Sequence, residues 1–148
     1  MILSYSLLVG SALCLMWTDV RKQTIPLWAL LLFIMASVLH QLYEPNSEGL
    51  WVAGLLLLLF LGCQSIYYFF TRKLAIGWGD VLLVPFCGFW LYFHELPSFL
   101  LGTGLVALLM GLLWRYKWGL RTFPFVPALL LGLGIVFLIR CFLIKNGI

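Results

Sequence analysis

Apolar residues occur along this chain in long runs separated by short polar stretches. A helix crosses the apolar core of a bilayer with about 20 mostly apolar residues. The pattern therefore predicts an all-α fold, a polytopic membrane bundle of six transmembrane helices forming one domain over residues 1–148. The range 76–94 contains Pro85 and reaches spanning length only with residues 77–80, which leaves a re-entrant or broken helix open there. We expect the helices at 1–18, 24–43, 49–70, 76–94, 97–114 and 122–143.

Composition agrees with a membrane protein. Hydrophobic residues make up 64% of the chain and charged residues 9%, whereas a soluble domain is about half apolar and about a quarter charged. The net charge of +4 comes from basic residues between apolar runs, a pattern typical of membrane topology rather than of nucleic-acid binding. We therefore expect membrane lipids and no nucleic acid as partners. The Cys and His residues form no ligand cluster, so we expect no metal and no cofactor.

The basic residues also predict an orientation. Placing the first, third and fifth loops in the cytoplasm puts seven of the nine Lys and Arg residues inside, with Arg140 and Lys145 as exceptions. Asp19 and Asp80 then lie at the cytoplasmic edge, and both chain ends face outward. The basic loop residues are Arg21, Lys22, Arg72, Lys73, Arg115, Lys117 and Arg121, and the second and fourth loops carry Glu44, Glu48 and Glu95.

Asp19 and Asp80 are the only aspartates, and each adjoins an apolar run. Taken singly, Asp19 fits a solvated loop residue beside Arg21 and Lys22, and Asp80 fits an ordinary helix N-cap. Taken together, two acidic residues at the same membrane edge indicate function. A close carboxylate pair shares one proton, so that the ionised member activates water and the protonated member polarises a carbonyl. Asp80, near a helix N-terminus, would hold the charge and Asp19 the proton.

Glycines near the second aspartate have two interpretations. Gly77 and Gly79 either break the structure between helices or allow unusual backbone angles that turn Asp80 toward a neighbouring helix. Elsewhere, small residues predict close helix packing. These residues are Gly49, Ala53, Gly54, Gly102, Gly104, Gly111, Gly132 and Gly134.

The segments TDVRKQTIP, at 18–26, and GWGD, at 77–80, resemble the type IV prepilin peptidases, which are membrane aspartyl proteases of the GxGD type. A third segment, FPFVPAL at 123–129, resembles the family's PFGPxL element. The resemblance covers nearly the whole chain in order. The first motif is matched by Asp19, Arg21, Ile25 and Pro26, the second by Gly77, Gly79, Asp80 and Val81, and the third includes Pro124 and Pro127.

The resemblance implies an aspartic endopeptidase of the bacterial inner membrane. Asp19 and Asp80 would be catalytic, supported by the other motif residues. The substrates would be type IV prepilins or pseudopilins of pilus or secretion systems, cut after a glycine at the cytoplasmic face. Many bacterial relatives have an additional N-terminal cytosolic region linked to methylation of the new N-terminus. The sequence shows no such region, so we expect cleavage without methylation.

Two residues depart from the family pattern. Leu82 stands where a Lys is frequent, and Val126 stands where Gly is usual. These two departures support an alternative interpretation, in which the chain is a catalytically reduced homologue that acts as a non-enzymatic membrane assembly subunit. A proton or ion carrier and a GxGD protease with other substrates are further alternatives. His40 and His94 fall near the opposite edge, where a structural or interfacial role is expected.

Overall fold

The computed structural model describes residues 2–72, 77–118 and 124–145. In these ranges every regular element is helical, as the apolar runs predict. The elements are α1 (Ile2–Lys22), α2 (Leu27–Tyr43), α3 (Ser47–Thr71), α4 (Trp78–Gly88), the 3-10 turn η1 (Phe93–Glu95), α5 (Leu96–Trp118) and α6 (Val126–Lys145).

Four helical segments are long and apolar enough to cross a membrane, namely Leu3–Lys22, Ser47–Thr71, Phe93–Lys117 and Val126–Lys145. The expected helix at 76–94 is shorter than predicted, since α4 has 11 residues and ends at Gly88. At about 1.5 Å per residue, α4 covers roughly half of a 30 Å apolar layer. α2 has 17 residues and is slightly short of spanning length. Within the described ranges the bundle thus contains six α-helices, four of which are long and apolar enough to cross a membrane.

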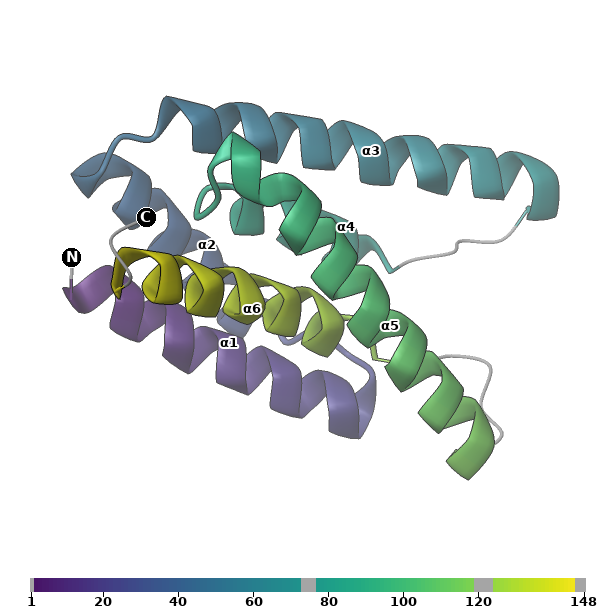
Figure 1. The fold of residues 1–148 in the computed structure, drawn as a ribbon. Coiled ribbons are helices and arrows are strands. Elements are labelled where there is room, and N and C mark those ends of the chain that lie inside the picture. Colours follow the sequence, from purple (N-terminus) through teal and green to yellow (C-terminus); the bar gives the residue numbers. More distant parts are fainter. Residues whose placement is uncertain (1, 73–76, 119–123, 146–148) are drawn as a thin grey trace.

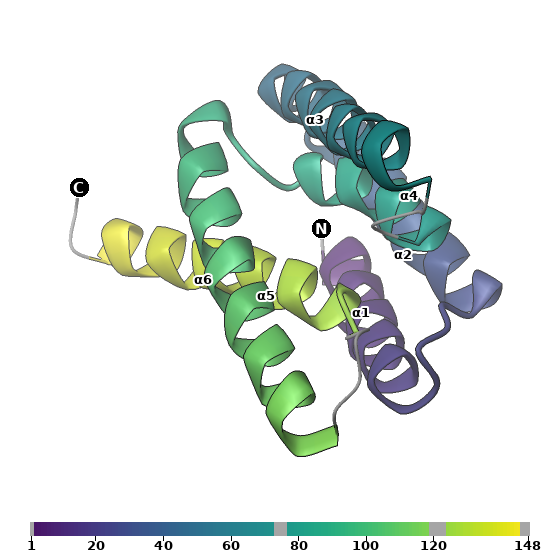
Figure 2. The same ribbon diagram turned by 90° about the vertical axis from the view of Figure 1, so that its right-hand side faces the viewer.

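The helices run between two ends of the bundle (Figure 1). α1 and α3 both finish, and α6 starts, at the end that faces the viewer in Figure 2, while the termini lie near the opposite end. α4 lies inside the bundle against α2, α3 and α6, and α5 crosses α6 on the outside. The side chains of Phe33, Trp90 and Phe99 are fully buried between these layers. This arrangement brings the start of α4 and the start of α6 toward the last turn of α1.

Glycine packing confirms part of the prediction about small residues. A Cβ atom at Gly88 would lie 2.6 Å from the Cα atom of Ala53, so α3 and α4 touch backbone to backbone. Gly132 of α6 is in similarly close contact with Thr103 of α5. The prediction is wrong for Gly54, Gly104 and Gly134, where a Cβ atom would meet nothing within 4 Å.

Arg140, an exception to the charge rule, has an ion-pair partner. Its Nε atom donates to Oε1 of Glu95 at 2.8 Å, and its Nη2 atom donates to the Trp90 carbonyl at 2.9 Å. The Glu95 side chain is largely buried. Arg140 is therefore held by a fixed acidic partner at the end of the bundle away from the aspartates.

Candidate active site

Asp19 lies in the last turn of α1 and is buried, with 6% of its surface exposed. Its Oδ2 atom accepts a hydrogen bond of 3.0 Å from the backbone N–H of Val126, a residue 107 positions away. Val126 is the first residue of α6, where backbone N–H groups lack helical partners and carry partial positive charge. The interpretation of Asp19 as a solvated loop residue is therefore wrong, because its carboxylate is buried against a second helix.

The turn after Asp19 leads directly toward the second aspartate. Gln23 ends α1 in a left-handed conformation, φ 50°, and its N–H donates to the Asp19 carbonyl at 2.9 Å. Pro26 then starts α2 as its N-cap, and its carbonyl accepts the N–H groups of Ala29 and Leu30. Between them, the Ile25 side chain reaches Gly79 of α4. The two sequence motifs are thus in contact.

Gly77 and Gly79 provide space rather than unusual backbone angles. Gly77 has φ −65° and ψ 144°, which any residue can adopt, and Gly79 lies within α4. A Cβ atom at Gly79 would lie 2.8 Å from Cδ1 of Ile25, and one at Gly77 would lie 3.2 Å from Oδ2 of Asp80. The glycines let the Ile25 side chain and the Asp80 carboxylate come close to the α4 backbone. The interpretation based on unusual backbone angles is wrong for both.

Asp80 occupies the first turn of α4, outside the four helices long enough to span. Burial raises the pKa of its carboxyl to about 6, and the nearby Asp19 carboxylate acts in the same direction. A hydrogen bond from the Gly77 backbone N–H lowers the pKa and partly opposes these two effects. Asp80 is thus a carboxyl close enough to Asp19 to sense its charge, and it ionises at a higher pH than a free carboxyl does.

The protonation of the two carboxyls stays a prediction, because burial and a backbone hydrogen bond act on both of them. The carboxylate of Asp19 accepts an N–H at the positive end of α6, an interaction that favours an ionised group. Asp80 is the member whose ionisation is opposed by burial and by its neighbour. Both carboxyls thus accept a backbone N–H near the start of a helix, Asp19 from Val126 and Asp80 from Gly77.

The remaining motif residues divide into two groups. Pro124 is buried before α6, and Pro127 lies in the first turn of α6, beside the Val126 N–H that binds Asp19. Arg21 lies apart, because its guanidinium stacks over the Trp17 ring at 4.1 Å on the exposed side of α1. Phe123, the first residue of the third motif, falls outside the described residues.

One contact of the candidate site was not predicted from sequence, the hydrogen bond between the Val126 N–H and Asp19. Val126 is fully buried and lies in α6 without a positive φ. In the described ranges, the non-glycine residues with a positive φ are Gln23 and Arg72. A Gly is therefore not required at position 126 for this backbone. The Pro-rich start of α6 was the available signal, since it marks a helix N-terminus near the membrane edge.

The described residues contain no group of three His, Cys, Asp or Glu side chains arranged to hold a metal ion. The helical bundle carries two aspartates near each other at one end, Asp19 buried and Asp80 half-buried.

Comparison with known families assigns the chain more closely. The type IV leader peptidase family matches residues 6–112, a range that includes Asp19 and Asp80, and the chain belongs to this family. The third motif lies beyond the matched range. No curated protein and no solved structure matched the chain.

Proposed function

We propose that this protein is a membrane aspartic endopeptidase that removes leader peptides from type IV prepilins or pseudopilins. The observation that carries the proposal is the meeting of Asp19 and Asp80 at one end of the bundle, where Asp80 senses the charge of Asp19. Membership of the type IV leader peptidase family supports the same reaction. The two carboxyls come from helices that are far apart in sequence, and the start of α6 and the Ile25–Gly79 contact hold them.

The proposed chemistry uses the unequal surroundings of the two carboxyls. Ionised Asp19 takes a proton from a water molecule while that water attacks the scissile carbonyl carbon. Protonated Asp80 donates a hydrogen bond to the carbonyl oxygen and stabilises the negative charge that develops there. The new C–O bond forms, the C–N bond of the tetrahedral intermediate breaks, and the leaving nitrogen receives the proton that Asp19 took up. Two positioned carboxyls thus supply both general base and general acid.

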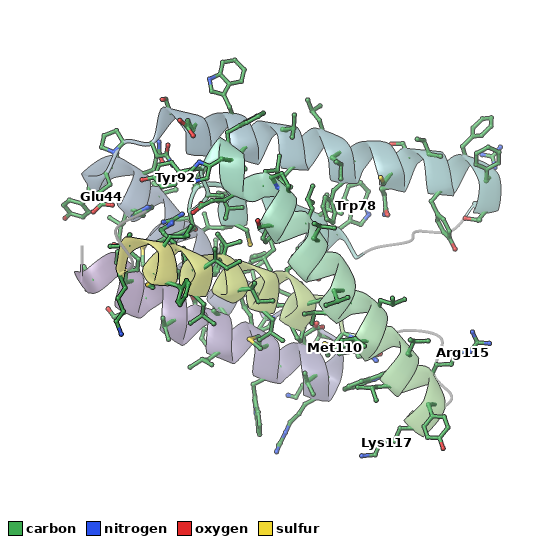
Figure 3. All side chains as sticks on the ribbon, viewed as in Figure 1. Glu44, Trp78, Tyr92, Met110, Arg115 and Lys117 are labelled. Atoms are coloured by element: carbon green, nitrogen blue, oxygen red, sulfur yellow. The ribbon has the colours of Figure 1, made fainter. Side chains whose placement is uncertain are left out.

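The proposed location is a bacterial inner membrane, with the aspartates facing the cytoplasm. Basic side chains at the aspartate end support this orientation, and Figure 3 shows Arg115 and Lys117 there, away from Glu44. A prepilin carries a hydrophobic helix directly after its leader, so the cleavage site would lie at the same membrane edge. An enzyme within the membrane can meet that site by diffusion in the same plane.

The second candidate function is a non-enzymatic assembly subunit that keeps the fold. Its support is Leu82, where many relatives have a Lys. Leu82 is 52% exposed, so the substitution removes a surface charge without changing the packing around Asp80. Val126 gives the alternative little support, because its backbone N–H holds Asp19.

A co-expression assay tests the proposal. The chain is produced in membranes with a panel of prepilins and pseudopilins, and leader removal is read as a size shift and as the mass of the new N-terminus. We expect processing by the wild type and none by Asp80→Asn, with equal amounts of inserted protein. Processing by Leu82→Lys, with none by the wild type, would favour the catalytically reduced homologue. Failure of both to cut any substrate would contradict the proposed peptidase.

A further inference from the structure

A polar pocket lies at the end of the bundle opposite the aspartates. Its volume is about 190 Å³, which at about 30 Å³ per water corresponds to about six water molecules. The space fits a small polar group and excludes a folded partner. Figure 3 shows Glu44 and Tyr92 at this end. Its lining includes Tyr5, His40, Glu44, Trp90 and Arg140.

Aromatic side chains form one wall of this polar pocket. The rings of His40 and Trp90 are stacked with centroids 4.0 Å apart, and the Tyr5 ring meets Trp90 edge-on at 5.2 Å. The Trp90 indole N–H donates to Oγ of Ser37 at 2.9 Å, which fixes the ring. Because ring faces here pack against other rings, they do not form an open cage for a cation.

The charges around the polar pocket do not cancel. Arg140 makes two hydrogen bonds to Glu95, at 2.8 and 2.5 Å, so its positive charge already has a partner. Glu44 has a half-exposed side chain, and its nearest basic atom is Nδ1 of His40 at 3.9 Å. The pocket therefore keeps an acceptor for a cation at Glu44. It also offers donors for an anion, namely the hydroxyl of Tyr5 and the remaining N–H groups of Arg140.

A second pocket adjoins the polar one at Arg140. It has a volume of about 390 Å³, lies along the end of α6, and is lined in part by the apolar side chains of Val136, Ile139 and Leu143. Arg140 lines both pockets. A polar space and an apolar space that meet at one side chain fit an amphipathic ligand better than a water-soluble one.

We propose that the two pockets bind one phospholipid whose headgroup carries both a phosphate and a primary ammonium group. The ammonium would donate to Glu44, and the phosphate would accept from Arg140 and the Tyr5 hydroxyl. Part of an acyl chain would lie against Val136 and Leu143. An anionic lipid without an ammonium group would leave Glu44 unpaired beside its phosphate, and a choline headgroup has no N–H to donate.

Native mass spectrometry of the delipidated full-length protein tests this inference. The protein is mixed with equal amounts of phosphatidylethanolamine, phosphatidylglycerol and phosphatidylcholine, and the bound lipid is counted. We expect phosphatidylethanolamine to be retained about fivefold to tenfold over the other two, as one charge-assisted hydrogen bond allows. Glu44→Gln should bring the ratio near one, and Tyr5→Phe should weaken retention of all three lipids.

Two matched variants at the same end serve as controls. Glu48→Gln and Tyr43→Phe change residues outside the two pockets and should keep the wild-type preference. Equal retention of the three lipids by the wild type, or an unchanged preference in Glu44→Gln, would overturn the inference. Displacement of the lipid by equimolar glycerophosphoethanolamine would assign the site to a soluble headgroup instead. None of these outcomes depends on peptidase activity.

Discussion

The contact between Gly88 and Ala53 determines how closely α4 approaches α3, and Gly88→Ala tests its importance. The added methyl carbon would lie 2.6 Å from Cα and 2.7 Å from N of Ala53. These are backbone atoms, so no side-chain rotation can relieve the overlap. Carbon atoms attract best at about 3.5–4.0 Å. The two helices must therefore separate by roughly 1 Å, the difference between these distances.

The separation has a cost in stability and a cost in catalysis. Overpacking of a close interface destabilises by about 1–3 kcal/mol. Gly88 lies eight residues after Asp80, about 12 Å along the same helix. A shift of α4 as a rigid body would move the Asp80 carboxyl by a similar amount relative to Asp19. A misplacement of about 1 Å can lower the rate of a positioned reaction on the order of 100-fold.

The matched control is Gly54→Ala, next to Ala53 on α3, where a methyl group would meet nothing within 4 Å. Thermal unfolding of both variants in one detergent, with cleavage rates for a prepilin that the wild type processes, gives the two readouts. We expect Gly88→Ala to lose both stability and activity, and Gly54→Ala to match the wild type. Gly88→Ala with wild-type unfolding temperature and rate would refute the close backbone packing.

Three further predictions concern the carboxyl groups. In the folded state the pKa of Asp80 is raised from 3.8 to about 6, so ionisation of this carboxyl lowers the stability of the fold as pH rises from about 4 through 6. The unfolding temperature of the wild type should therefore fall relative to that of Asp80→Asn over this pH range. Parallel curves for the two proteins would contradict the raised pKa. Glu95→Gln leaves Arg140 without its ion-pair partner and should destabilise by about 3 kcal/mol, whereas exposed Lys145→Gln should change unfolding by less than about 0.5 kcal/mol. Asp19→Glu should lose cleavage, because an added methylene moves the carboxylate away from the Val126 N–H, and a wild-type rate would contradict the need for that position.

The fold was largely predictable, because the bilayer sets the length of an apolar helix. The expected helix over 76–94 was wrong at its end, because the apolar run continues past Gly88 but α4 does not; the broken helix left open there fits the structure better. Trp90 lies two residues after Gly88, and its indole N–H donates to Ser37 of α2, a contact that no local pattern encodes. The ion pair between Arg140 and Glu95 was also missed. Arg140 is an exception to the rule that basic residues lie in the cytoplasmic loops, and this exception was the available signal. Glu95 is the acidic residue at the same end of the bundle with which Arg140 pairs.

The aspartates were predictable as a pair because charge is rare in this chain and both lie at one membrane edge. The contact that positions Asp19 was not predictable, because its partner is the Val126 N–H at the start of α6, 107 positions away. The glycines illustrate the same limit. Sequence shows that Gly79 is small, but only the fold shows that the Ile25 side chain occupies the space beside it.

The most direct test of the central claim is a cleavage rate measured for Asp19→Asn, Asp80→Asn and the double variant, each inserted in membranes at the wild-type level. Two carboxyls that act as one unit give non-additive losses. We expect each single variant to fall to the background rate and the double variant to fall no further. A near-wild-type rate for either single variant, or a double variant far slower than both, would contradict a catalytic pair of Asp19 and Asp80.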